Sequence, residues 1–251
     1  MLKVENISVT IAGTSIVSDI CFELNKNDIF TISGPNGAGK TMLIKAIMGI
    51  IPHKGKAFLD GKDISTINPK DLAKEIGVLS QRHNIQFDYQ VRQVVELGRY
   101  CHKKGLFATL TDNDNDIIDN AMEITGIKQL QHRSILTLSG GELQRVFLAQ
   151  IFTQRPKIII LDEPTNHLDL QYQIEIFEIV KEWVKEGDRS VMAIVHDLNF
   201  VYTYATKALL IKDGVNYSYG KVSDVLSCDN LKNVYNIDVY NWMNKLTSHW
   251  R

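Results

Sequence analysis

A phosphate-binding loop is indicated by the segment Gly34-Pro35-Asn36-Gly37-Ala38-Gly39-Lys40-Thr41, which fits the pattern G-x-x-x-x-G-K-[ST]. Glycines let the backbone curl around an anion, and a following helix N-terminus adds a partial positive charge. In such a loop Lys40 reaches the β- and γ-phosphates of a nucleoside triphosphate, and the Thr41 hydroxyl ligates Mg²⁺. We include Met42, the next residue, among the expected nucleotide contacts. The alternative is a glycine-rich turn without a ligand, which the flanking elements disfavour.

Two adjacent carboxylates form the second candidate group. The apolar run 158–161 leads directly into Asp162 and Glu163. This places both at the carboxyl end of a buried strand, where open α/β sheets bind ligands. Asp162 is predicted to hold Mg²⁺ through water, and Glu163 is the candidate general base for an in-line water. The alternative for this pair is a simple helix N-cap.

Two further strands are predicted to end in polar residues. The run 191–195 leads to His196, and the run 76–79 leads to Gln81. A lone histidine at a strand end is more often structural than catalytic. The convergence of three strand ends with groups suited to a γ-phosphate, a metal and a water favours catalysis.

The elements that would position these residues alternate between strands and helices. Short apolar runs at 29–33, 76–80, 158–161 and 191–195 are typical of strands buried on both faces. The apolar spacing after Gly39 and between 176 and 184 is helical, and the region from about 91 to 152 is mainly helical, with loop chemistry at 111–114. Hairpins are expected around 12–14 and around Asp213-Gly214, with a short helix at 222–226. The fold class is therefore α/β.

Composition excludes several classes of protein. The chain has 251 residues, a net charge of −1 and 44% hydrophobic residues, which is ordinary for a globular protein and too balanced for a general nucleic-acid binder. It contains no run of about 20 apolar residues and no apolar signal-peptide core after Met1. Three cysteines without a C-x-x-C pair fit a reducing compartment.

A third motif, Leu138-Ser139-Gly140-Gly141-Glu142, precedes a helix with Val146 and Phe147 on its apolar side. Physical reasoning alone leaves a simple helix cap by Ser139 equally open. Together with the phosphate loop and the acidic pair, in this order, the motif resembles the signature of the ATP-binding cassette (ABC) ATPases, and the resemblance covers nearly the whole chain.

The resemblance implies an architecture and further roles. The fold would be a RecA-like P-loop NTPase core (1–88 and 156–251) with an N-terminal antiparallel β subdomain and an inserted helical subdomain (89–155). Gln81 matches the Q-loop glutamine that contacts Mg²⁺ and the attacking water, His196 matches the switch histidine, and 166–169 matches the D-loop. Two copies would enclose two molecules of ATP, each between the phosphate loop of one copy and the signature of the other. Ser139, Gly141 and Asp169 are then expected contacts of ATP across that homodimer.

One position departs from the family pattern. Most members carry an aromatic residue in the first hairpin that stacks on adenine, and the matching position here is Ile11. An isoleucine gives apolar contact without ring stacking. Adenine is therefore expected to be held loosely, or by another residue.

The stretches 94–100, 162–170 and 195–199 resemble ATPases of bacterial importers for iron chelates (ferric siderophores and haem) and of the related cobalamin and molybdate systems. The expected partners are transmembrane permease subunits at the cytoplasmic face of the membrane and, indirectly, a substrate-binding protein, with no nucleic acid. An apolar docking surface on the permease could come from Phe87, Tyr89, Tyr100, Leu106 and Phe107, whereas burial of most of them in the helical core is the favoured alternative. An exporter ATPase for lipids or lipoproteins and a soluble ABC protein stay open as alternatives.

Overall fold

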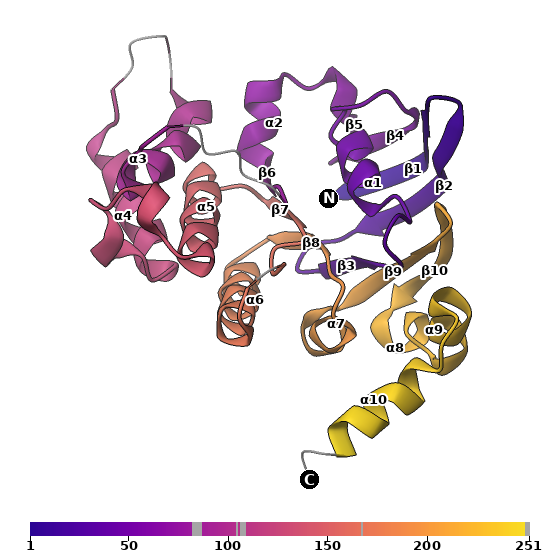
Figure 1. Ribbon diagram of the computed structural model, residues 1–251. Coiled ribbons are helices and arrows are strands. Elements are labelled where there is room, and N and C mark those ends of the chain that lie inside the picture. Colours follow the sequence, from indigo (N-terminus) through magenta and orange to yellow (C-terminus); the bar gives the residue numbers. More distant parts are fainter. Residues whose placement is uncertain (82–86, 104, 106–108, 167, 249–251) are drawn as a thin grey trace. The chain divides into compact units, whose positions relative to one another are not determined.

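The computed structural model describes residues 1–81, 87–103, 105, 109–166 and 168–248. The chain forms two compact units, one made of Met1–Thr66 with Ile194–Arg251 and the other of Ile67–Ala193 (Figure 1). Both units contain strands and helices, as expected for an α/β fold. No helix within the described residues is apolar enough over a sufficient length to cross a bilayer.

The first unit is built on a sheet in which the described strands follow the order β5-β4-β1-β2-β10-β9-β3. β1 pairs antiparallel with β2 and β4, whereas β3 pairs parallel with β9. The elements are β1 (Leu2–Ile11), β2 (Thr14–Leu24), β3 (Ile29–Ser33), α1 (Lys40–Ile47), β4 (Lys54–Leu59), β5 (Lys62–Asp63), η1 (Ile64–Thr66), α7 (Leu198–Tyr204), β9 (Lys207–Lys212), β10 (Val215–Lys221), α8 (Val222–Val225), α9 (Cys228–Tyr235) and α10 (Val239–Thr247).

Both predicted hairpins are confirmed, and their turns share the same backbone conformation. Ala12 and Gly13 join β1 to β2 with φ of 47° and 79°, and Asp213 and Gly214 join β9 to β10 with φ of 50° and 77°. Two successive positive φ values match the right-handed twist of the flanking strands. A small residue or Asp followed by Gly adopts them at low cost.

The second unit holds three neighbouring strands in the order β8-β7-β6 and a group of helices. β6 and β7 are parallel, with Ile76 opposite Ile158 and Leu79 opposite Leu161. The elements are α2 (Pro69–Glu75), β6 (Ile76–Leu79), α3 (Val91–Glu96), η2 (Leu97–His102), α4 (Asp112–Ile124), η3 (Lys128–Leu130), η4 (Ile135–Thr137), α5 (Gly140–Gln154), β7 (Ile158–Asp162), α6 (Leu170–Lys185) and β8 (Ser190–Ile194). The 89–155 boundary of a helical subdomain stays a prediction.

Three of the strands that precede predicted site residues, β3, β7 and β8, are fully buried. Such burial is expected for runs of β-branched and other apolar residues without alternation. A polar residue that follows such a strand lies where the chain leaves the core.

One local prediction was wrong. Residues 111–114 were expected to form a loop, but only Thr111 stays outside α4. Its hydroxyl accepts the Asp114 N–H at 3.2 Å, and the Asp114 carboxylate accepts the Thr111 N–H at 2.9 Å. This capping box starts a helix from residues that otherwise favour turns.

Candidate functional site

The phosphate loop runs from the end of β3 to the start of α1, as predicted. Gly34 is buried at its start, Gly37 is exposed at its tip, and Gly39 caps α1 with a φ of 90°. Pro35, Asn36 and Ala38 complete the turn, and Thr41 and Met42 lie half-buried in the first turn of α1.

Two of these glycines are required by close packing. A Cβ atom on Gly34 would lie 2.1 Å from the carbonyl oxygen of Ile211, and one on Gly39 would lie 2.8 Å from that of Ile16. Both positions also have positive φ, which strains any other residue. The loop therefore depends on backbone from β9 and β2.

Lys40 lies inside the loop. Its side chain is 5% exposed, and Nζ donates to the carbonyl oxygens of Gly34 at 2.9 Å and of Pro35 at 2.8 Å. A buried ammonium that contacts backbone dipoles needs little movement to contact an anion bound in the same loop. The loop geometry thus fits the phosphate chemistry predicted for it.

His196 lies at the edge of the sheet where the phosphate loop begins. The preceding residue, Val195, donates its N–H to the Ile32 carbonyl at 3.2 Å and accepts the Ser33 hydroxyl at 3.0 Å. Ser33 is the last residue of β3, directly before Gly34. The structure therefore brings His196, which is half-buried, to the strand end that carries the loop.

Sequence reasoning missed Tyr235 in α9. Burial raises the pKa of its phenol, and a hydrogen bond from the Gly34 backbone opposes that increase. The phenol thus contacts the first residue of the phosphate loop from the far end of the chain. No local pattern around Tyr235 indicates this contact.

In the second unit, Asp162 and Glu163 lie at the end of β7. Asp162 is 6% exposed, whereas Glu163 is half-buried and has a φ of 55°. The helix-cap alternative is wrong, because the next helix, α6, begins only at Leu170. The left-handed conformation of Glu163 turns the chain out of the strand.

The Glu163 carboxylate is held by two amides. Oε2 accepts hydrogen bonds from Gln81 Nε2 and from Asn166 Nδ2. Gln81 was expected to contact Mg²⁺ and the attacking water, and the structure places its amide on the carboxylate of the candidate base. Asn166 was named only as part of the D-loop; it reaches Glu163 because the turn after β7 folds back on itself.

The signature segment caps α5. The Ser139 hydroxyl accepts the Glu142 N–H at 3.3 Å, and the Ser139 N–H donates to Glu142 Oε2 at 2.8 Å. The backbone hydrogen bond from Ser139 is the main reason that the pKa of Glu142 lies below its ordinary value. Ser139 is therefore the predicted cap, and it is exposed.

The D-loop leads into α6. Asp169 is exposed at the N-cap position, and the Gln173 amide donates to the Leu168 carbonyl at 2.8 Å. His167 lies outside the described residues. Ile11, the position matched to the adenine-stacking residue, ends β1 opposite Thr14 and is 47% exposed, so it can offer an apolar surface.

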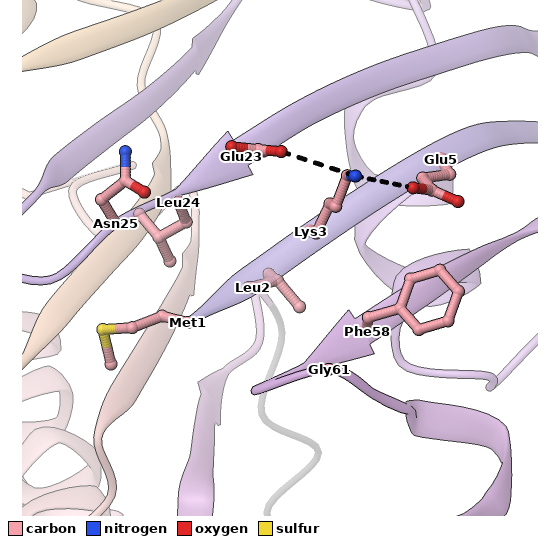
Figure 2. A pocket seen from close by; sticks show the side chains of 9 residues that line it. All are labelled: Met1, Leu2, Lys3, Glu5, Glu23, Leu24, Asn25, Phe58 and Gly61. Carbon is pink, nitrogen blue, oxygen red and sulfur yellow. Dashed lines mark ion pairs between the residues drawn. The ribbon is translucent and has the colours of Figure 1, made fainter.

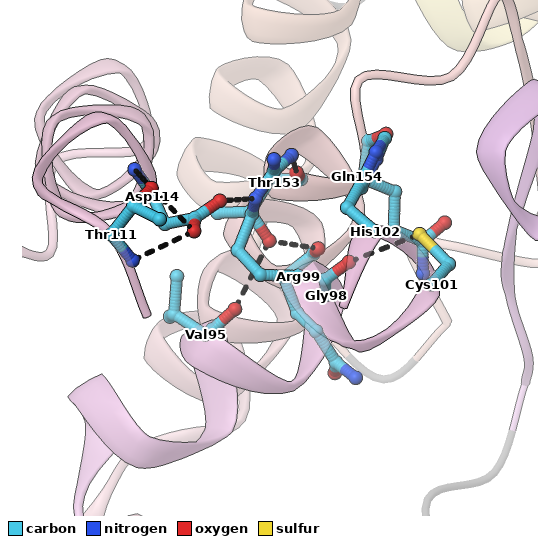
Figure 3. A network of polar contacts seen from close by, with 10 residues as sticks. Val95, Gly98, Arg99, Cys101, His102, Thr111, Asp114, Thr153 and Gln154 are labelled. Carbon is cyan, nitrogen blue, oxygen red and sulfur yellow. Dashed lines mark hydrogen bonds and ion pairs between the residues drawn. The ribbon is translucent and has the colours of Figure 1, made fainter. Parts of the chain in front are cut away.

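The Leu97-Gly98-Arg99 element anchors the helical region (Figure 3). Arg99 is 6% exposed; its Nε donates to Asp114 at 2.7 Å and its Nη1 to the Thr153 carbonyl at 2.7 Å. A Cβ on Gly98 would lie 2.0 Å from both the Gln150 carbonyl oxygen and the Thr153 hydroxyl. This motif therefore ties η2 to α4 and α5.

Three aromatic side chains that were expected in the core lie on the surface. Phe87, Tyr89 and Tyr100 are 64%, 46% and 68% exposed, so the core alternative is wrong for them. The rings of Phe87 and Tyr89 contact each other edge to face, with their centroids 6.2 Å apart. Leu106 and Phe107 lie outside the described residues.

A separate cavity of about 400 Å³ lies over β1, β2 and β4 (Figure 2). Lys3 crosses it between Glu5 at 2.9 Å and Glu23 at 3.8 Å. None of its lining residues belongs to the predicted site.

Comparison with known families decides the identity. The family model described as ABC transporter matches residues 17–166, which is more than half of the chain. The chain belongs to the ABC transporter family. This ABC chain is 35% identical to the iron(3+)-hydroxamate import ATP-binding protein FhuC of Bacillus subtilis (strain 168), over 94% of this chain and 88% of FhuC.

Other relatives of this ABC chain are longer. It is 35% identical to the uncharacterized ABC transporter ATP-binding protein YvrA of the same strain and 34% identical to the cobalamin import protein BtuD of Halobacterium salinarum (strain ATCC 29341 / DSM 671 / R1). The alignments cover 95% of this chain in both cases, but only 54% of YvrA and 59% of BtuD.

Among solved structures, a metal-chelate type ABC transporter in an inward-facing conformation superposes with a TM-score of 0.82. The identity is 28%, over 94% of this chain and 89% of that chain. The predicted fold, a P-loop core with an antiparallel β part and an inserted helical part, is confirmed at the level of fold class.

Proposed function

We propose that this chain binds and hydrolyses ATP with Mg²⁺ as the motor subunit of an ABC importer. The observation that carries the proposal is the phosphate loop, in which the buried Lys40 ammonium contacts the loop carbonyls from within. The loop backbone and Lys40 bind the triphosphate, and Thr41 lies at the start of α1, where a phosphate-bound cation is expected.

The residues present fit Mg²⁺. A hydroxyl from Thr41, an amide oxygen from Gln81 and the buried Asp162 carboxylate are hard oxygen donors, the type that Mg²⁺ prefers. When bound, the ion would supply charge neutralisation on the phosphate oxygens. Asp162 would hold it through water, because Mg²⁺ retains several of its water ligands.

Glu163 is the proposed general base. Its carboxylate is oriented by Gln81 and Asn166, so that it can accept a proton from the attacking water. His196 contacts the γ-phosphate, and positioning by these groups lowers the barrier because little reorganisation is left for the reaction.

The active form is proposed to be a homodimer. The exposed Ser139 and the buried Gly141 open α5, and Asp169 opens α6. By family resemblance, these residues complete the ATP site of a second copy. Each chain thus contributes to two sites.

The cargo is proposed to be an iron chelate. Support comes from the similarity to FhuC and to the metal-chelate type transporter, and from the resemblance of the stretch 94–100 to ATPases of iron-chelate importers. The exposed Phe87, Tyr89 and Tyr100 are proposed to dock on a permease. The chain would then work at the cytoplasmic face of the membrane, and a substrate-binding protein would deliver the chelate to the permease.

The test is transport by the chain reconstituted with its permease in vesicles. We expect ATP hydrolysis that rises when a chelate-loaded binding protein is added, with inward movement of the chelate. Hydrolysis without import, or export of lipid, would favour the exporter alternative. Failure to co-purify with any polytopic membrane subunit would favour a soluble ABC protein, and absence of MgATP binding would refute the proposal outright.

A further inference from the structure

The first turn of α5, which follows the signature residue Ser139, packs closely against the ring of Tyr172. A Cβ on Gly141 would lie 2.5 Å from Tyr172 Cγ and 2.7 Å from each Cδ. Cγ lies on the χ2 axis, so a flip of the ring about χ2 would not relieve this clash; the whole side chain or its helix would have to shift. Only glycine lets α5 approach Tyr172 of α6 this closely.

Arg145 covers the same ring one turn later in α5. Its guanidinium lies 5.4 Å from the Tyr172 ring centroid, and its Nη1 lies 3.2 Å from Glu175 Oε2. The other Glu175 oxygen accepts the Gln171 amide at 2.8 Å. With the Arg145 side chain only 17% exposed, this cation–π contact is partly desolvated and holds the ring in place.

The segment before α6 reaches the signature as well. A Cβ on Gly140 would be in contact with the Leu168 side chain at 3.5 Å, and Gln173 fixes the Leu168 carbonyl from within α6. Glycines 140 and 141 therefore rest on two residues of the chain segment that follows Glu163. These contacts join the signature to the D-loop within one copy.

We propose that Tyr172, held by Arg145, is a positioning residue that sets the signature segment for ATP of a second copy. The inference rests on the proposed function, because it assumes that Ser139 and Gly141 contact that ATP. The ring acts through the backbone of Gly141 and touches no nucleotide itself. Tyr172 therefore couples the segment that follows the proposed base, Glu163, to the signature segment that contacts the ATP of the second copy.

The experiment uses ATP-driven dimerisation. In a Glu163→Gln background, which should retain ATP, we measure the dimer fraction by sedimentation over a series of MgATP concentrations. Binding of a fluorescent ATP analogue to the monomer is the second readout, because it depends on the phosphate loop and not on the signature.

We expect Tyr172→Ala to raise the MgATP concentration for half-maximal dimerisation about ten-fold, since ring packing and the cation–π contact are lost together. Tyr172→Phe keeps the ring and should match the parent. Arg145→Met should give an intermediate increase. The matched control is Tyr217→Ala, an exposed tyrosine of β10, which should change nothing. Monomer affinity for the analogue should be the same in all variants.

Unchanged dimerisation in a folded Tyr172→Ala variant would overturn the inference, as would a loss of monomer binding in parallel with dimerisation. If circular dichroism shows that Tyr172→Ala does not fold, Arg145→Met decides by the same criteria. A Glu163→Gln parent that binds no MgATP, or that binds it without dimerising, refutes the proposed function instead, and the inference with it.

Discussion

Asp114 should be the residue on which the helical region depends most strongly for charge-based stability. Its carboxylate accepts the Thr111 N–H and hydroxyl, and it pairs with Arg99 at 2.7 Å with side-chain exposures of 15% and 7%. The backbone hydrogen bond from Thr111 is the main cause that lowers the pKa of Asp114 from 3.8 to about 2, assisted by the Thr111 hydroxyl and by Arg99.

Asp114→Asn should therefore lower the free energy of unfolding by about 2 kcal/mol at pH 7. The lowered pKa corresponds to about this amount, and it already includes the interaction of the carboxylate with Arg99. Urea unfolding followed by Trp183, which is buried and stacked on Phe152 at 5.7 Å, measures this loss within the same unit.

The sign of the pH dependence follows from the lowered pKa. The folded protein holds the Asp114 proton more weakly than the unfolded chain does. The stabilisation is thus complete above pH about 4 and is lost as the pH falls from about 4 to about 2. The difference between wild type and Asp114→Asn should shrink over that range.

The matched control is Asp112→Asn, which removes the same charge from the same helical turn at an exposed position. It should cost less than about 0.5 kcal/mol. If Asp114→Asn and Asp112→Asn were equally stable at pH 7, the assignment of Asp114 as the anchor of Arg99 would be refuted.

Three further predictions concern the nucleotide. Glu163→Gln should bind ATP but lower kcat by about two to four orders of magnitude, the usual share of a general base; near-wild-type turnover in a steady-state assay would remove Glu163 from that role. Lys40→Ala should raise the dissociation constant of ATP about 10- to 100-fold in a titration, because a charge-assisted contact is lost; an unchanged constant would contradict its assignment. Ile11→Tyr should tighten ATP binding about ten-fold by adding base stacking; an ATP dissociation constant that is the same in the variant and the wild type would show that residue 11 does not face the base.

The parts of the site that could be predicted are those encoded in short segments. The phosphate loop needs glycines at fixed spacing after a strand, and the acidic pair needs only an apolar run before Asp162. The hairpin turn at Asp213-Gly214 is likewise local, because two positive φ values depend on those two residues.

The parts that could not be predicted depend on contacts between distant segments. Tyr235 contacts Gly34, and Tyr172 rests on Gly141, yet neither tyrosine differs in local pattern from a core aromatic. The prediction that Tyr100 is buried was wrong because hydrophobicity predicts burial only on average. The loop predicted at residues 111–114 was wrong because turns and helix N-caps favour the same residue types, so the sequence alone did not distinguish them.

The conformation of Glu163 connects stability with function. Among the described residues with positive φ that are not glycine, most are Asn or Asp, whose short side chains tolerate this region. Glu163 has no such tolerance, and its φ of 55° costs about 1 kcal/mol that glycine would avoid. Local stability therefore does not explain a glutamate at the end of β7. The proposed reaction, which needs a carboxylate there that Gln81 and Asn166 orient, would account for it.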